Sequence, residues 1–336
     1  MSRHTKLNIL SFLVIGILIT WGKYTIVIGQ TTVKPILVAL NKADNTLAII
    51  EPGEMKVLGK VATGDSPHEV VLSADGKTAY VANYGAQTPG SSISIIDTVT
   101  MKETRRVDVS PLRRPHGLKE IGGKLYFTSE TNRIIARYDP AANKIDWMMG
   151  TGQNGSHMVV TTADQKKFYT ANIGSDSVTA FEFNDVPPAP SKITHIPVGK
   201  QPEAIDVSPD GKEVWVGLNA EGGIDIVDTS TNKVIERVKL GERPYRVMFT
   251  PDGKQVFCTM PNTKEIVVID AATRKELRRM KLETVPIGIT FSKNGKSAFV
   301  TAVQPDAALK IDLEKFEVAG RADSGKGPDG IAVAGL

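Results

Sequence analysis

One pattern occurs seven times along the chain, and this repetition restricts the fold more than any other feature. Each copy starts at a proline or its substitute and continues with an apolar strand, a tight turn and a second strand. The copies start at Pro67, Pro115, Ser156, Pro202, Pro244, Pro286 and Pro328, with spacings of 41 to 48 residues. In the first copy the turn contains Asp75-Gly76. An Asp-Gly pair between alternating apolar residues is a strong signal for a β-hairpin.

Two further strands complete each copy. The third ends in Asp-Thr or a similar pair, as at Asp97-Thr98, and the fourth leads back to the next starting position. Four strands in about 40–45 residues are typical of a β-propeller blade. Residues 33–66 supply three strands and the end of the chain supplies one, which together make a composite blade. The sequence therefore predicts an all-β, seven-bladed β-propeller with four antiparallel strands per blade, closed by the N- and C-terminal strands.

The amino terminus has a different pattern. Arg3, His4 and Lys6 precede an apolar run at residues 7–21, which is the arrangement of an export signal. No Ala-x-Ala cleavage site follows, so residues 1–29 are interpreted as a signal peptide or an N-terminal anchor. Residues 33–336 are predicted to form a single propeller domain. We expect an exported protein, periplasmic or extracellular, that meets a membrane only through this segment if it stays uncleaved.

The repeats also resemble a known family. Tyr80-Val81-Ala82-Asn83, together with Ser-Pro-Asp-Gly-Lys and Ile-Asp-Thr elements, looks like the YVTN family of β-propeller proteins, whose repeats are similar to WD40 repeats. The resemblance covers the chain from residue 33 onward and implies the fold, because propellers host many unrelated activities. Propellers of this architecture include secreted surface proteins, lactonases and haem-d1-binding domains, and none of their catalytic sets matches this chain residue by residue.

The residues that directly follow each starting residue form the candidate site. Inner strands of a propeller all begin on one face, so these residues should line the mouth of the central channel. They are His68, His116, His157, Glu203, Tyr245, Ile287 and Asp329. Because the ring closes, Asp329 neighbours His68. Five successive blades therefore offer Asp329, His68, His116, His157 and Glu203, which we call the mouth arc and predict to be metal ligands.

Imidazoles and carboxylates are ligands for zinc, copper and iron, and an open coordination position would accept a substrate. The predicted cofactor is therefore a transition metal (copper, zinc or iron) or a haem-like group. Arg114, Arg243, Tyr245 and Arg246 near the same mouth are predicted to contact it. Their positive charge would also suit a small polar or anionic ligand. The alternative is that the histidines only cap strand ends with hydrogen bonds.

Three functions stay open at this point, and the sequence does not decide whether the protein is an enzyme. The first is a propeller that binds a metal cofactor and a small polar ligand at the mouth, with redox or hydrolytic chemistry. The second is a non-enzymatic module that presents the insertions at residues 84–90 and 184–190 to a protein partner, although solvated loops are our default for both. The third is a lactonase-like hydrolase that uses histidine and arginine.

Other classes of function receive no support from the sequence. The net charge of +4 is too small to indicate a nucleic-acid partner. The single cysteine, Cys258, excludes both an intrachain disulfide and a CxxC metal site. Neither a GxSxG nor an HExxH motif is present.

Overall fold

The computed structural model describes residues 34–184, 190 and 192–336. Contacts divide the chain into two compact units, Met1–Thr32 and Val33–Leu336, and the described residues all belong to the second. The predicted signal peptide or anchor at residues 1–29 and most of the insertion at residues 184–190 lie outside the described residues. Across the residues that are described, no helix is long and apolar enough to cross a membrane.

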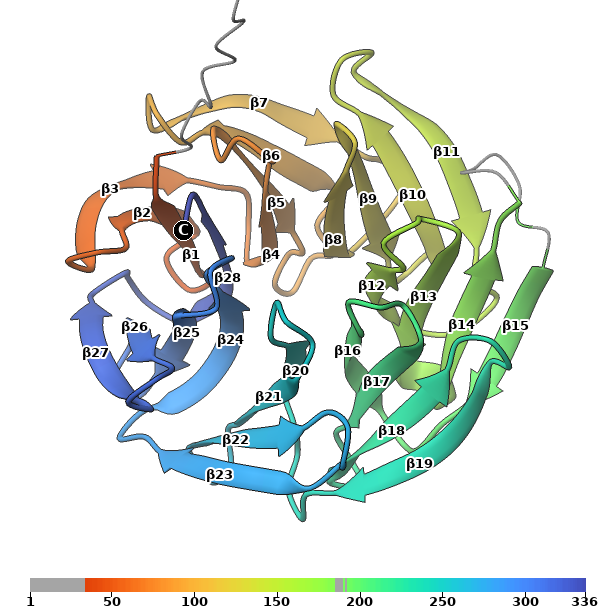
Figure 1. Ribbon diagram of the computed structural model, residues 1–336. Coiled ribbons are helices and arrows are strands. Elements are labelled where there is room, and N and C mark those ends of the chain that lie inside the picture. Colours follow the sequence, from red (N-terminus) through yellow and green to blue (C-terminus); the bar gives the residue numbers. More distant parts are fainter. Residues whose placement is uncertain (1–33, 185–189, 191) are drawn as a thin grey trace, which may run out of the picture. The chain divides into compact units, whose positions relative to one another are not determined.

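The strands form seven four-stranded sheets around a channel (Figure 1), which we number as blades 1 to 7. Blade 1 contains β28 (Pro328–Ala334), β1 (Ile36–Asn41), β2 (Thr46–Glu51) and β3 (Lys56–Ala62). Blade 2 contains β4 (Pro67–Leu72), β5 (Thr78–Asn83), β6 (Ser92–Asp97) and β7 (Lys102–Asp108). Blade 3 contains β8 (Pro115–Ile121), β9 (Lys124–Ser129), β10 (Ile134–Asp139) and β11 (Lys144–Gly150).

Blade 4 contains β12 (Ser156–Thr161), β13 (Lys167–Asn172), β14 (Ser177–Glu182) and β15 (Lys192–Pro197), with the short 3-10 helix η1 (Ile173–Ser175) after β13. Blade 5 contains β16 (Pro202–Val207), β17 (Glu213–Leu218), β18 (Gly223–Asp228) and β19 (Lys233–Lys239). Blade 6 contains β20 (Arg246–Phe249), β21 (Gln255–Met260), β22 (Glu265–Asp270) and β23 (Glu276–Lys281). Blade 7 contains β24 (Val285–Phe291), β25 (Ser297–Val303), β26 (Ala307–Asp312) and β27 (Glu317–Ala322). The predicted seven-bladed propeller is confirmed.

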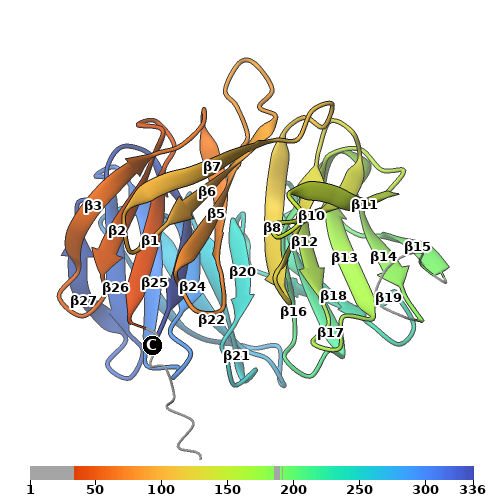
Figure 2. The same ribbon diagram turned by 90° about the horizontal axis from the view of Figure 1, so that it is seen from above.

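Blade 1 joins the two ends of the domain. β28 pairs antiparallel with β1, so that Leu37 lies opposite Val333 and Val38 opposite Ala332. The inner strands then contact one another in a closed ring, in which β28 touches both β24 and β4. Figure 2 shows the blades from the side, with the strands running between the two faces of the ring. The composite blade predicted from the residue count is therefore present.

The hydrophobic core lies between neighbouring blades. Side chains of blades 5 and 6 form one cluster, in which the fully buried Trp215 of β17 packs edge-on against Phe249 of β20 with ring centroids 5.5 Å apart. The outer strands are mostly exposed, as in β19. Each sheet therefore buries its faces against its neighbours, which is the packing that a ring of blades requires.

The Asp-Gly turns connect the first and second strands at the end of the blade away from the mouth. Gly76 has a φ of 70°, a left-handed conformation that glycine adopts without strain. Asp75 accepts hydrogen bonds from the amide of Lys77 at 3.1 Å and from the hydroxyl of Ser73 at 2.7 Å. Turns of this kind recur at Gly211, Gly253 and Gly295. The predicted hairpins are confirmed, and they place the mouth at the opposite end of each inner strand.

Removing β28 should unfold the propeller, because β1 would lose its pairing partner and the ring would open. Deletion of residues 328–336 is expected to abolish the cooperative thermal transition or to lower Tm by at least about 10 °C. Circular dichroism during heating measures this. Deletion of residues 335–336 alone removes a single backbone hydrogen bond, from Lys293 to Leu336 at 2.8 Å, and serves as the control. An unchanged transition in the longer deletion would contradict the closure by β28.

Candidate functional site at the channel mouth

The inner strands carry a β-bulge beside the residues assigned to the mouth. In blade 2, Pro67 pairs with Asn83 but Glu69 pairs with Ala82, so β4 holds one residue more than β5 over this stretch. The register shifts in the same way in blades 1, 3, 4, 5 and 7. A bulge changes the direction of a side chain without ending the strand. Repeated around the ring, it allows residues from different blades to converge.

The three histidines of the mouth arc lie in a row. The ring centroids of His68 and His116 are 5.5 Å apart, and those of His116 and His157 are 3.7 Å apart. The second pair is stacked, with an angle of 28° between the ring planes. The structure thus brings together three side chains that are 89 residues apart from first to last.

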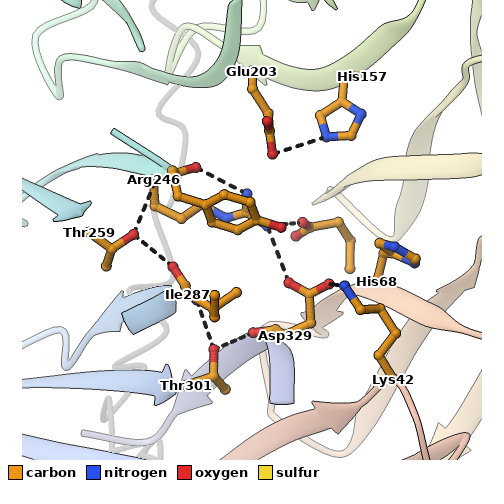
Figure 3. Close-up of polar contacts among 12 residues, drawn as sticks. Lys42, His68, His157, Glu203, Arg246, Thr259, Ile287, Thr301 and Asp329 are labelled. Atoms are coloured by element: carbon orange, nitrogen blue, oxygen red, sulfur yellow. Dashed lines mark hydrogen bonds and ion pairs between the residues drawn. The ribbon is translucent and has the colours of Figure 1, made fainter. Parts of the chain in front are cut away.

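His157 lies between two carboxylates. Its Nδ1 forms a hydrogen bond with Glu130, and its Nε2 is 3.8 Å from Oε1 of Glu203 (Figure 3). Burial lowers the pKa of His157, but the hydrogen bond and charge of Glu130 and the charge of Glu203 outweigh burial and hold this pKa above 6.5. Burial raises the pKa of Glu130, yet His157 and the hydroxyl of Tyr84 lower it further, to below 4.5. Below this raised pKa, His157 is an imidazolium that donates to an ionised Glu130.

The other two histidines are neutral. His116 is 2 % exposed, and its Nδ1 has no hydrogen-bond partner among the described residues. Burial and the positive charge of His157 hold the pKa of His116 well below 6.5. Nδ1 of His68 lies 2.8 Å from the carbonyl oxygen of Ser66, so this nitrogen carries the hydrogen and Nε2 is left as an acceptor. Burial also lowers the pKa of His68, although the charge of Asp329 opposes it.

Asp329 lies at the other end of the mouth arc and is 1 % exposed. One carboxylate oxygen accepts a hydrogen bond from Nζ of Lys42 at 3.0 Å. The second oxygen, Oδ1, has no hydrogen-bond partner among the described residues, and the nearest guanidinium nitrogen, Nη2 of Arg246, is 4.0 Å away. Figure 3 shows Lys42, Asp329 and Arg246 following one another on the side of the mouth away from His157.

Arg246 closes the channel below the mouth. It donates to the carboxylate of Glu69, so that an ion pair joins blades 6 and 2 across the ring. Burial raises the pKa of Glu69, and the charge of Arg246 opposes that rise. A cavity of about 480 Å³ lies along the inner strands, and its lining includes Glu69 and Arg246 but no residue of the mouth arc. The ion pair therefore separates the mouth arc from the rest of the channel.

The predicted cofactor-contacting residues fall into separate environments. Tyr245 lies between two guanidinium groups, with the Cζ atoms of Arg243 and Arg246 at 5.2 and 4.8 Å from its ring centre. Burial raises the pKa of Tyr245, so its phenol stays protonated. Arg114 lies on the far side of the mouth, where it stacks over Tyr84 at 4.5 Å. Tyr245, Arg243 and Arg246 thus form one group, and Arg114 does not join it.

The structure adds functional residues that the sequence analysis did not assign. Tyr84 belongs to an insertion expected to be a solvated loop, yet its ring lies 4.4 Å from His68 and 5.3 Å from His116. Its hydroxyl donates to Glu130. Both Tyr84 and Glu130 directly follow a second strand, β5 or β9, and such strands end on the mouth face. That position is a signal in the sequence that places both residues at the mouth, although it does not reveal their partners.

Threonines of the second strands hold the backbone of the mouth residues. Thr301 of β25 donates to the carbonyl of Asp329 in the next blade and accepts from the amide of Gly288 at 2.8 Å. Thr128 bonds the carbonyl of His157 in the same way, at 2.6 Å. Thr259 bonds the carbonyl of Ile287 likewise, at 2.8 Å, so the backbones of Asp329, His157 and Ile287 are each held by the blade before them; Figure 3 shows the bonds from Thr259 and Thr301.

The arrangement does not fit one metal ion bound by all three histidines. Two imidazoles on one tetrahedral ion have ring centroids about 5 Å apart, given metal–nitrogen bonds of about 2.0–2.1 Å. The pair His68–His116, at 5.5 Å, is compatible with this, whereas His116 and His157 are stacked at 3.7 Å. Among the described residues no group of three or more His, Cys, Asp or Glu side chains has the geometry of a metal site.

Comparison with known proteins gives a family and a fold. A family model described as a YNCE-like beta-propeller matches residues 120–295, more than half of the chain. No curated protein sequence matches the chain.

Solved structures resemble the chain over most of its length. Hydrazine synthase of Kuenenia stuttgartiensis is 18% identical, with a TM-score of 0.71 over 83% of this chain and 92% of that chain. A candidate 6-phosphogluconolactonase of Bacteroides fragilis is 14% identical, with a TM-score of 0.74 over 90% and 99%. The dihydro-haem d1 dehydrogenase NirN is 13% identical, with a TM-score of 0.64 over 90% and 76%. At these identities the similarity concerns the fold alone.

The opposite pKa shifts of His116 and His157 can be measured directly. In ¹⁵N NMR spectra of the folded protein, His157 should titrate above pH 6.5 and His116 below it, because only His157 faces carboxylates. Glu130→Gln should lower the titration midpoint of His157, because burial lowers its pKa and the variant removes the Glu130 charge that raises it. Glu242→Gln, which changes a half-buried carboxylate bonded to Asn262, should leave this midpoint unchanged. Midpoints of both histidines on the same side of pH 6.5 would contradict this assignment.

Proposed function

The chain belongs to the YNCE-like β-propeller family, and we propose that it binds a small polar molecule at the channel mouth and hydrolyses it by general acid–base catalysis. One observation carries the proposal: adjacent imidazoles, with centroids 3.7 Å apart, have pKa values shifted in opposite directions. Neighbouring groups of one chemical type whose environments separate their pKa values commonly serve as an acid and a base. The mouth therefore offers both roles near neutral pH.

The proposed step uses the two protonation states as they stand. Neutral His116 accepts a proton from a water molecule whose oxygen attacks an ester carbonyl, and the imidazolium of His157 donates a proton to the leaving alcohol oxygen. The C–O bond of the ester breaks as the new C–O bond to water forms, so that the products are an acid and an alcohol. A proton passed from His116 to His157 then restores the initial state.

The neighbouring side chains support these two roles. Glu130 orients the His157 ring through Nδ1 and stabilises its positive charge, while Tyr84 holds Glu130 in place. His68 presents a free acceptor at Nε2 beside His116. The buried Nδ1 of His116 lacks a hydrogen-bond partner among the described residues, which is unusual for a buried polar atom and is consistent with a ligand-binding surface.

A panel of chromogenic esters and lactones tests this function. The wild-type protein should hydrolyse at least one of them, and the rate should rise with pH through the lowered pKa of His116 and fall through the raised pKa of His157. His116→Asn and His157→Asn should each reduce kcat/KM by on the order of 10²–10⁴. His195→Asn changes an exposed histidine of β15 and should have no effect. No turnover on the whole panel, or a double variant as active as the wild type, would refute the proposal.

A second candidate function is a metal-dependent site, and the 5.5 Å separation of His68 and His116 favours it. These two imidazoles would be the protein ligands, because Asp329 is bonded to Lys42 and no third His, Cys, Asp or Glu side chain among the described residues completes a metal-site geometry with them. His157 and Glu203 would stay outside this ligand set, because they face each other. Such a site would hold copper, zinc or iron, or an iron of a haem-like group, and would supply an electrophile or a redox centre.

Metal analysis and an absorption spectrum separate the two candidates. The metal-dependent candidate predicts about one equivalent of metal or chromophore in the purified protein, lost in His68→Asn and His116→Asn but retained in His157→Asn. The acid–base candidate predicts hydrolysis that survives treatment with a chelator and fails in His157→Asn. Protein without stoichiometric metal or chromophore would exclude the second candidate.

A further inference from the structure

The charges at the mouth can be assigned to partners almost completely. Lys42 bonds Asp329, Arg246 bonds Glu69, and His157 bonds Glu130. Glu203 accepts a hydrogen bond from the side chain of Asn219 and faces His157. Three of these carboxylates therefore have a cation of their own, whereas Glu203 has a neutral donor and shares the charge of His157.

Two of the arginines predicted to contact a cofactor, Arg114 and Arg243, are not in these pairs, and their hydrogen bonding differs. Arg114 donates to the carbonyl oxygens of Gly85 and Ala86 at 3.4 and 3.3 Å, so it fastens the loop that carries Tyr84. Arg243 forms no ion pair or hydrogen bond with any residue that the structure describes. Its Nε is buried and unpartnered, although a guanidinium nitrogen removed from water normally finds an acceptor. Arg243 is therefore a positive charge at the mouth without a counter-ion.

The position of Arg243 is set by Tyr245. Its guanidinium lies 5.2 Å from the centre of the Tyr245 ring, and Arg246 occupies the other nearby position on the same ring at 4.8 Å. Stacking on an aromatic face orients the planar guanidinium and keeps its fork of N–H groups available. Tyr245 occupies the mouth position of blade 6, next to Glu203 of blade 5, so this fork belongs to the same mouth as the histidines.

We propose that Arg243 binds an oxyanion, and that the natural ligand of the mouth carries a carboxylate or phosphate group at the end held by Tyr245. The proposal rests on the proposed function only for the reacting end of the ligand. A guanidinium matches both anions with two parallel hydrogen bonds. A ligand anion at this end of the mouth would meet the guanidinium of Arg243, which has no acidic partner among the described residues. Arg246, the other arginine on the Tyr245 ring, has its guanidinium bonded to Glu69.

Binding of simple oxyanions tests the inference without any knowledge of the substrate. Isothermal titration calorimetry with inorganic phosphate and with benzoate should give saturable binding to the wild-type protein, weakened by added salt. The tighter of the two probes shows whether the ligand carries a phosphate or a carboxylate. Trimethyl phosphate, which has similar shape but no charge, should not bind. Arg243→Gln should weaken the preferred probe at least ten-fold, about 1.4 kcal/mol.

Two further variants keep the test specific. Arg243→Lys keeps the charge but not the fork, and it should bind with intermediate affinity. Arg113→Gln removes an exposed arginine of the connection between β7 and β8 and should bind as the wild type does. Thermal melting verifies that each variant is folded. Binding of neither probe, or equal binding by Arg243→Gln and the wild type, would overturn the inference.

The outcomes also separate this inference from the proposed hydrolysis. Oxyanion binding through Arg243 without turnover on the ester panel would refute the hydrolytic function and leave the subsite standing. If the protein hydrolyses an ester and Arg243→Gln binds the oxyanion as tightly as the wild type, only the oxyanion subsite is refuted.

Discussion

The pairing of β28 with β1 is the interaction on which the rest of the structure depends. A sheet with a free edge can pair with other chains, and a ring of blades removes that edge only when its last blade is completed. Here the C-terminal strand completes blade 1 and lies against both β24 and β4. This closure makes Asp329 a neighbour of His68, although the two residues are 261 positions apart.

Within the ring, the same residue type takes different chemical states because of its neighbours. His116 packs against another ring and has an unpartnered Nδ1, so burial keeps it neutral. His157 is also buried, but Glu130 and Glu203 supply negative charge and raise its pKa. Carboxylates on the two neighbouring blades therefore set the pKa of His157, and with it the chemistry available at the mouth.

Much of the architecture could be read from local pattern. The starting prolines, the Asp-Gly turns and the alternation of apolar residues depend on neighbours in sequence, and all seven sheets follow from them. The register after Pro67, Pro115 and Ser156 also identified residues that the structure places together. The roles of Tyr84, Glu130 and Glu69 could not be read in this way. Each acts through a partner 46, 27 or 177 positions away, and no periodic pattern records such pairs.

By itself, the sequence determined the number of blades, their strands and the set of residues that face the mouth, because β-structure repeats its side-chain directions every two residues and its turns need specific residues. Only the tertiary structure decided how those residues pair. In the folded chain, His116 stacks on His157, and Glu130 bonds His157. Glu69 pairs with Arg246, and Arg243 lies on Tyr245 with no acidic partner among the described residues. These side-chain pairings depend on distances across a closed ring, and the packing between blades sets those distances.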